Sequence, residues 1–112
     1  MSSDRTFTGN RLTVGDRSWV VPYPVRDARR IRDCIVVIYD YISGPKHAAF
    51  HNVEAFDDAG RKLWTAENPG TSAADAYVEF ISAEPLIIGN FAGYRCTIDP
   101  ATGKLLKAHF TK

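Results

Sequence analysis

Two histidines, His47 and His51, stand four positions apart in the segment 39–52, which also contains tyrosine and lysine. A His-x-x-x-His pair binds zinc when a helix brings both rings to one face and a third ligand lies nearby. Here Gly44 and Pro45 precede the pair, so the segment is expected to be a loop. No acidic residue follows in the metalloprotease pattern. The sequence therefore predicts neither a metal site nor a cofactor.

Acid–base chemistry is the other reaction that these residue types permit. One histidine can take a proton and a second can return it, as in the cleavage of RNA. Tyr39, Tyr41 and Lys46 would then line the pocket, although sequence spacing does not fix their geometry. A small-molecule-binding or catalytic β-domain that uses loop 39–52 stays open as the alternative function. The chain has no nucleophile elbow and no phosphate-binding glycine loop to support it.

The elements that must position this loop are expected to be short strands. Apolar segments rich in β-branched and aromatic residues alternate with glycine, proline and aspartate, which is typical of an all-β domain. Residues 11–21 predict a hairpin around a two-residue turn at Gly15-Asp16. Residues 34–39 are continuously apolar, which predicts a central strand covered on both faces. The first ten residues are expected to form a frayed end.

Two similar phrases occur along the chain, AFDDAGRKLW at residues 55–64 and TIDPATGKLL at 97–106. In both, an aspartate caps a turn and a glycine supplies the positive φ before the next strand. The flanking strands also correspond, so residues 25–67 and 76–110 are predicted to be two copies of a four-stranded antiparallel meander. Repeats of about 40–50 residues are typical of β-propeller blades. The predicted fold is all-β, with two blade-like meanders plus the N-terminal hairpin, in a single domain over 1–112.

The repeated phrase resembles that of quinoprotein-type β-propellers, Ala-x-Asp-x-x-Thr-Gly-x-x-x-Trp. The matching positions in the two copies are Ala55, Asp57, Gly60, Trp64, Asp99, Thr102 and Gly103. Lys107 stands where the second copy would carry its tryptophan. The resemblance implies blade architecture but no activity, and no quinone cofactor, because that site needs a closed ring of blades. We expect the two meanders to stack as a sandwich with the hairpin covering one end, or to assemble with other chains.

Residues 26–33 contain four arginines, namely Arg26, Arg29, Arg30 and Arg32. Such a run can contact phosphates, but Asp27 and Asp33 interrupt it. The overall pI of about 7.8 also lies below the basic range of nucleic-acid-binding modules. The sequence therefore does not favour a nucleic-acid partner. Two strands around Arg32-Asp33 are predicted here, with a single helical turn near residues 27–30 as the alternative.

Cys34 and Cys96 lie far apart in the sequence, each within an apolar run. Neither belongs to a Cys-x-x-Cys or Cys/His pattern, so both are predicted to be buried and unpaired. The N-terminus lacks the apolar region of a signal peptide. No apolar run approaches the roughly 18 residues of a membrane span. The sequence therefore predicts a reduced cytoplasmic protein without a membrane partner.

The net charge is +1, but the charged residues are unevenly distributed along the chain. Residues 54–84 contain seven acidic residues and only two basic ones, Arg61 and Lys62. This acidic segment favours a basic partner. Loop 39–52 lengthens the first copy, and its tyrosine, histidine and phenylalanine side chains are frequent in binding surfaces.

These observations predict a non-enzymatic protein-binding module. Its most concrete form is an immunity protein that neutralises a co-encoded bacterial toxin, such as a contact-dependent growth inhibition toxin with a basic domain. Assembly as a homo-oligomer remains open. The predicted partner-binding residues come from loop 39–52 and from the start of the acidic segment: Tyr39, Tyr41, Lys46, His47, Phe50, His51, Glu54, Asp57 and Asp58.

Overall fold

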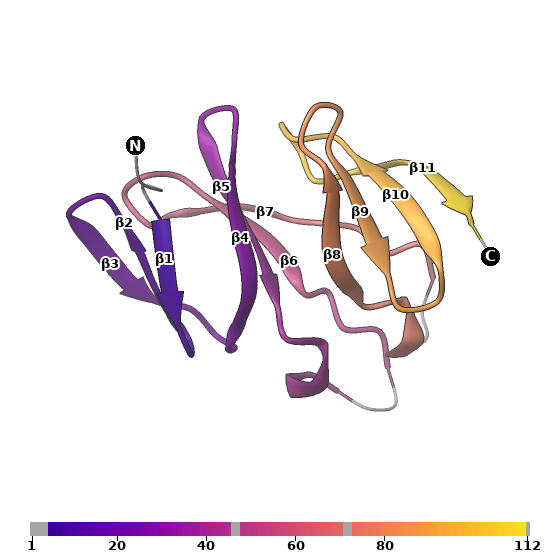
Figure 1. Ribbon diagram of the computed structural model, residues 1–112, viewed down its shortest axis with the longest axis horizontal. Helices are drawn as coiled ribbons and strands as arrows, with labels where there is room; N and C mark the ends of the chain where they lie inside the picture. Colours follow the sequence, from indigo (N-terminus) through magenta and orange to yellow (C-terminus); the bar gives the residue numbers. More distant parts are fainter. Residues whose placement is uncertain (1–4, 46–47, 71–72, 112) are drawn as a thin grey trace.

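The computed structural model describes residues 5–45, 48–70 and 73–111, which form three antiparallel sheets (Figure 1). The N-terminal sheet contains β1 (Arg5–Thr8), β2 (Arg11–Val14) and β3 (Arg17–Val20). The middle sheet contains β4 (Val25–Ile31), β5 (Cys34–Tyr39), β6 (Val53–Phe56) and β7 (Lys62–Thr65). The C-terminal sheet contains β8 (Tyr77–Ser82), β9 (Ile87–Asn90), β10 (Tyr94–Ile98) and β11 (Leu105–Phe110). Two short 3-10 helices, η1 (Tyr41–Ser43) and η2 (Ala73–Asp75), lie in the connections.

The predicted all-β class and both four-stranded meanders are confirmed. Each four-stranded sheet follows chain order, β4-β5-β6-β7 and β8-β9-β10-β11. Strand β5 is buried at every position, as its continuous apolar run predicted. Gly15 has φ +62° at the first position of the β2–β3 turn, which suits a two-residue hairpin turn. Residues 27–30 belong to β4, so the helical alternative is wrong.

Residues 5–8 differ from the prediction, because they are not frayed, whereas residues 1–4 lie outside the described residues. Residues 5–8 form β1, which pairs with β2 from Arg5 opposite Val14 to Thr8 opposite Arg11. Backbone hydrogen bonds from Val25 N–H to Gly9 O (2.7 Å) and from Val21 N–H to Asn10 O (2.8 Å) hold the β1–β2 turn. A single apolar residue in this polar segment carries no strand signal of its own, so pairing with β2 stabilises it.

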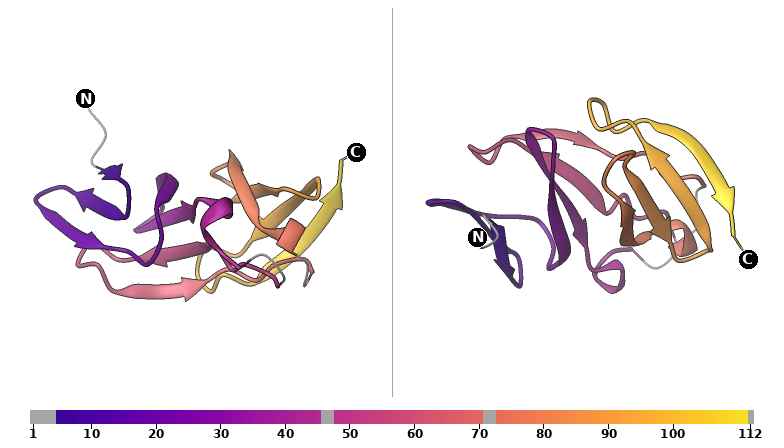
Figure 2. Two further views of the ribbon diagram at one scale, coloured as in Figure 1. Left: turned by 90° about the horizontal axis from the view of Figure 1, so that it is seen from below. Right: turned by 45° about the horizontal axis from the view of Figure 1, so that its top comes forward.

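The two meanders pack face to face as expected, whereas the expected position of the hairpin at one end is wrong. The three sheets follow one another along the long axis, with the middle sheet between the other two (Figures 1 and 2). On one face of β5, Val36 and Ile38 join an apolar cluster with the C-terminal sheet. On the other face, Ile35 and Val37 join a cluster with the N-terminal sheet. The hairpin therefore covers a face of the middle sheet, not an end, because both faces of β5 are apolar.

One contact recurs at both seams between sheets. Trp19 of β3 covers Gly60 in the β6–β7 turn, where an added Cβ would lie 2.9 Å from the indole. Trp64 of β7 covers Gly103 in the β10–β11 turn, where an added Cβ would lie 2.6 Å from the indole. The Trp64 Nε1–H also donates a hydrogen bond to the Pro100 carbonyl at 2.9 Å. Each tryptophan thus joins its own sheet to the next one along the chain.

The same spacing explains where the stack ends. Trp19 and Trp64 each follow a turn glycine by four positions, and the third sheet has Lys107 at that place. Lys107 is exposed on β11. Across the outer face of the C-terminal sheet, Arg95 lies beside His109 in the strand register, and both are exposed. A terminal repeat with a polar outer face needs no further sheet to cover it.

The close contact of Trp64 with Gly103 predicts a strong and position-specific effect of adding a methyl group. Gly103→Ala places Cβ in the indole and in a residue with φ +79°, so we expect a loss of about 2–4 kcal/mol of unfolding free energy. Gly15→Ala is the matched control, because φ is +62° there but no atom lies within 4 Å. That variant should lose only about 1 kcal/mol. Urea unfolding measures both, and equal losses would contradict the close packing of Trp64.

Candidate functional site

Two aromatic residues of the predicted binding loop are buried. Tyr39 and Phe50 belong to the cluster between the middle and N-terminal sheets. Tyr23 packs against both, with ring centroids 5.7 Å from Tyr39 and 4.7 Å from Phe50. The Tyr39 hydroxyl donates a hydrogen bond to Glu54 Oε1 at 2.7 Å. These side chains hold the loop against the sheets and are not available to a partner.

Glu54 belongs to the same internal network. Its second oxygen, Oε2, accepts hydrogen bonds from Thr65 Oγ1 (3.0 Å) and Lys62 Nζ (3.4 Å). Burial, followed by the hydrogen bond to Glu54, raises the pKa of Tyr39 well above its ordinary value. Tyr39 therefore keeps its proton at neutral pH and cannot act as a base in the catalytic alternative.

Asp57 and Asp58 lie in the β6–β7 turn, at the end of β6 opposite to loop 39–52 (Figure 1). The Asp57 carboxylate accepts hydrogen bonds from the N–H groups of Ala59 and Arg61, both at 2.9 Å. The Arg61 backbone bond is the main cause that lowers the pKa of Asp57. Asp58 forms a salt bridge with Arg30 at 3.0 Å. Asp57 is therefore a turn cap, and the predicted binding residues do not gather at one place.

The remaining predicted residues divide as follows. Tyr41 is half-buried in η1, and His51 is exposed. Lys46 and His47 lie outside the described residues, so the His47–His51 pair has no observed geometry. Across residues 5–45, 48–70 and 73–111 there is no cluster of three or more potential metal ligands.

The acidic segment 54–84 does not form an acidic face. Besides Glu54 and Asp57, the carboxylate of Glu67 accepts a hydrogen bond from the Leu105 N–H at 2.7 Å. Asp75 is buried beside Asn90. Most of these carboxylates thus accept hydrogen bonds within the fold, and Asp58 and Glu84 pair with Arg30 and Arg32, so the segment does not present a row of unpaired acidic side chains.

The arginines of β4 have structural partners. Arg26 Nε–H donates to the Val78 carbonyl, and the Arg29 guanidinium lies 5.2 Å from the Phe80 ring centroid. Arg32 forms a salt bridge with Glu84 at 3.2 Å. Arg26 and Arg29 of β4 and Arg32 of the β4–β5 turn therefore join this hairpin to the C-terminal sheet, which accounts for the arginine run without a nucleic acid.

Asn52 is a buried residue that the sequence analysis did not single out. Its Nδ2 donates to the carbonyls of Tyr39 (2.9 Å) and Tyr77 (2.7 Å), and its Oδ1 accepts from the Tyr77 N–H (2.8 Å). The two bonds to Tyr77 run between the middle and C-terminal sheets, and the bond to Tyr39 lies within the middle sheet. Asn52 therefore fixes the relative position of the two sheets.

The two predicted free cysteines are confirmed. Cys34 and Cys96 are both buried and unpaired. The Cys34 thiol donates to the Ile31 carbonyl at 3.2 Å. Burial raises the pKa of both thiols, which keeps them protonated and unreactive at neutral pH.

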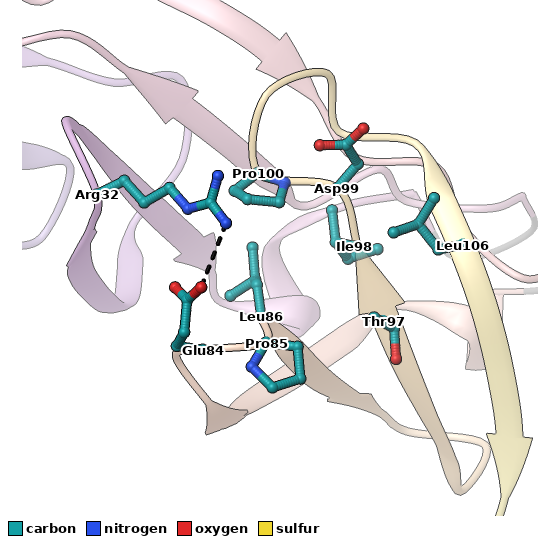
Figure 3. A pocket seen from close by; sticks show the side chains of 9 residues that line it. All are labelled: Arg32, Glu84, Pro85, Leu86, Thr97, Ile98, Asp99, Pro100 and Leu106. Carbon is teal, nitrogen blue, oxygen red and sulfur yellow. Dashed lines mark hydrogen bonds and ion pairs between the residues drawn. The ribbon is translucent and has the colours of Figure 1, made fainter.

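An open hollow of about 440 Å³ lies between the middle and C-terminal sheets, where their hairpin turns meet (Figure 3). The Arg32–Glu84 salt bridge crosses one side of it, and Leu86 and Ile98 form part of its apolar floor. The two charged side chains are 60% and 71% exposed, so the pair is well hydrated. Its described lining offers no nucleophile paired with a base, and we do not assign a reaction to it.

An exposed apolar surface lies at the other end of the sheets. Its five residues, the aromatic surface, are the ring pairs Tyr41–Phe91 and Tyr94–Phe110 together with Ile42, which follows Tyr41 in η1. Ring centroids lie 5.4 Å apart for Tyr41–Phe91 and 5.1 Å apart for Tyr94–Phe110. Ile42, Phe91 and Phe110 are 69%, 61% and 50% exposed.

The β9–β10 turn connects the two ring pairs of the aromatic surface. Gly93 lies in this turn, and an added Cβ there would lie 3.2 Å from the Phe110 ring. Only Tyr41 of these five residues is among the predicted binding residues; Ile42 falls in the same predicted loop, and Phe91, Tyr94 and Phe110 fall in predicted strands. The available signal was Phe91-Ala92-Gly93-Tyr94, in which an aromatic residue stands on each side of a turn.

The fold and this surface define an all-β protein of three stacked antiparallel sheets with an exposed aromatic patch. The chain belongs to the DUF7957 family, described as a domain of unknown function, whose profile matches residues 2–110. No curated protein and no solved structure matches the chain significantly. Within the described ranges, no helix has the length and apolar character needed to cross a membrane.

The buried tyrosines predict a specific pH dependence. Burial is the main cause that raises the pKa of both Tyr39 and Tyr77. Above a pH of about 10 the tyrosine hydroxyls of the unfolded chain lose their protons, whereas Tyr39 and Tyr77 in the folded state keep theirs. Their contribution to stability is therefore complete below pH 10 and falls above it, by about 1.4 kcal/mol per pH unit for each residue.

Ultraviolet titration of the five tyrosines measures this effect. Two should ionise only when the protein unfolds, and Tyr39→Phe should reduce the alkaline loss of stability. Ionisation of all five tyrosines before unfolding would contradict the buried network.

Proposed function

We propose that this protein is a non-enzymatic protein-binding module and that the aromatic surface is its contact surface. The observation that carries the proposal is the grouping of exposed Ile42, Phe91 and Phe110 at one end of the sheets. Contiguous exposed apolar surface is characteristic of interaction sites. Aromatic side chains dominate the binding energy of many protein interfaces.

The aromatic surface is also held in place before any partner binds. Tyr41 and Tyr94 are half-buried and support the exposed rings of Phe91 and Phe110. The Arg26 guanidinium lies 5.8 Å from the Tyr41 ring centroid. A surface whose side chains are already ordered loses less conformational entropy on binding.

In its most concrete form, this function is that of an immunity protein that neutralises a co-encoded bacterial toxin, such as a contact-dependent growth inhibition toxin. A single small domain that presents a rigid apolar surface suits an inhibitor that covers another protein. Because most carboxylates of segment 54–84 already have hydrogen-bond or salt-bridge partners within the fold, recognition through apolar contact is favoured over attraction of a basic toxin. The function assigns the protein to the cytoplasm, where Cys34 and Cys96 would stay reduced.

The contacts between successive sheets also support the resemblance to propeller blades. Trp19 on Gly60 and Trp64 on Gly103 repeat one contact between successive sheets. We therefore propose that the sheets are blade-like units used here as a scaffold for the aromatic surface.

Replacing exposed rings tests the proposal. The double variant Phe91→Ser/Phe110→Ser should weaken partner binding about tenfold or more, because central aromatic residues typically cost that much when truncated. Tagged protein is used to capture partners from the native host, and the toxin so identified is then co-expressed with each variant. Wild-type protein should restore growth and the double variant should not.

Leu63→Ser is the matched control, because Leu63 is also 50% exposed but lies on β7. It should capture the same partner as the wild type. A double variant that binds and protects as well as Leu63→Ser would refute the aromatic surface as the contact site.

A further inference from the structure

Strand β11 has an open edge beside the aromatic surface. In the C-terminal sheet it pairs with β10 on one side, and no described strand lies on its other side (Figure 1). The Thr111 N–H donates to the Gly93 carbonyl at 3.0 Å. Because the hydrogen-bonding direction alternates along an antiparallel strand, the N–H and C=O groups of Ala108 and Phe110 point to the open side. These groups are available to an added strand.

The other described edge strands are less suited to strand addition. Strands β1 and β3 have four residues each. The ladders of β4, β7 and β8 contain register shifts, and such irregularities discourage pairing with another chain. Strand β11 is six residues long; its ladder with β10 shifts register once, before Lys107, and Lys107–Phe110 then pairs regularly. Strand β4 has a regular run at Asp27–Ile31, but β1 lies against it and the Val25 N–H is already bonded to the Gly9 carbonyl. Strand β11 therefore combines a regular run with an open edge.

The two faces of β11 differ in chemistry. Ala108 and Phe110 share one face, which continues the aromatic surface, whereas Lys107 and His109 share the other. Arg95 lies opposite His109, so this face is basic. Glu79 of β8 is on the same face, three strands from β11, and its carboxylate lies over Gly89 of β9. An added strand would thus meet an apolar row on one face and a basic row on the other.

Self-pairing of β11 is disfavoured by these charges. Two copies of β11 could pair in antiparallel fashion only through the N–H and C=O groups that face away from β10. If that pairing were centred near Ala108, Lys107 of one copy would lie opposite Lys107 or His109 of the other. Two lysines directly opposite each other destabilise a sheet, and Lys107 opposite His109 gains no ion pair. An acidic row in the added strand would instead complement Lys107 and Arg95.

We propose that the partner protein adds an extended strand of alternating apolar and acidic residues to the open edge of β11. Its apolar residues would pack beside Phe110 and its acidic residues beside Lys107 and Arg95. Backbone hydrogen bonds to Ala108 and Phe110 would supply affinity, and the alternating side chains would supply specificity. This inference rests on the proposed function, because it states how the partner of the aromatic surface is held.

A capped peptide of alternating valine and glutamate is the probe, and the same peptide with lysine in place of glutamate is its control. Backbone amide NMR shifts of the full chain report where each peptide binds. The acidic peptide should shift the amides of β10 and β11 and should bind about fivefold more tightly than the lysine peptide. Its binding should weaken as salt concentration rises.

Two variants separate backbone pairing from charge. Ala108→Pro removes an outward N–H without removing a bond to β10, and it should weaken binding of the acidic peptide about tenfold. Lys107→Glu leaves the backbone intact and should shift preference toward the lysine peptide. Arg17→Glu on β3 is the control for charge reversal at an exposed site, and it should change neither affinity.

Equal affinity for the two peptides, or shifts confined to other sheets, would overturn the inference. A dimer in sedimentation that is lost in Ala108→Pro would also overturn it, since the edge would then hold a second copy. If the acidic peptide does not bind but Phe91→Ser/Phe110→Ser abolishes partner capture, strand addition fails and the proposed function stands. If the acidic peptide binds but the double variant captures the partner normally, the aromatic surface is refuted as the contact site and strand addition stands.

Discussion

The apolar character of β5 on both faces is the constraint from which the architecture follows. A strand buried on both faces is stable only when a layer covers each of them. The C-terminal sheet covers Val36 and Ile38, and the N-terminal sheet covers Ile35 and Val37. Because the outer faces of these two sheets are largely polar, the stack can end after three layers without a further subunit.

Burial alone does not decide how the layers are positioned on one another, since apolar contact is not directional. Directional contacts at the seams do so. Tryptophan on glycine fixes the distance between a strand and the next turn, and the hydrogen bonds of Asn52 fix the alignment of two backbones. The arginines of β4 and of the β4–β5 turn add further contacts across the same seam. Residues that suggested ligand or phosphate chemistry thus serve to hold the sheets together.

The proposed binding region lies where this covering ends. The middle sheet does not reach the far end of β11, so Phe110 is exposed together with Phe91 of the neighbouring turn. An open strand edge and an exposed aromatic patch therefore occur side by side. Each feature alone is common on protein surfaces, and their adjacency gives the C-terminal sheet a defined surface for a partner.

The sequence by itself determined the strands of both meanders and of the 11–21 hairpin, their turns, the repeat and the burial of both cysteines, but not β1. Those features depend on local alternation and turn residues such as Gly15 and Gly60. Only the tertiary structure decided which of the predicted binding residues are available to a partner. The N-terminal sheet buries Tyr39 and Phe50, and Glu54 accepts hydrogen bonds from donors within the fold. The aromatic surface was equally hidden from the sequence. Phe91 and Phe110 are separate in the chain and come together through antiparallel pairing, which local pattern cannot reveal.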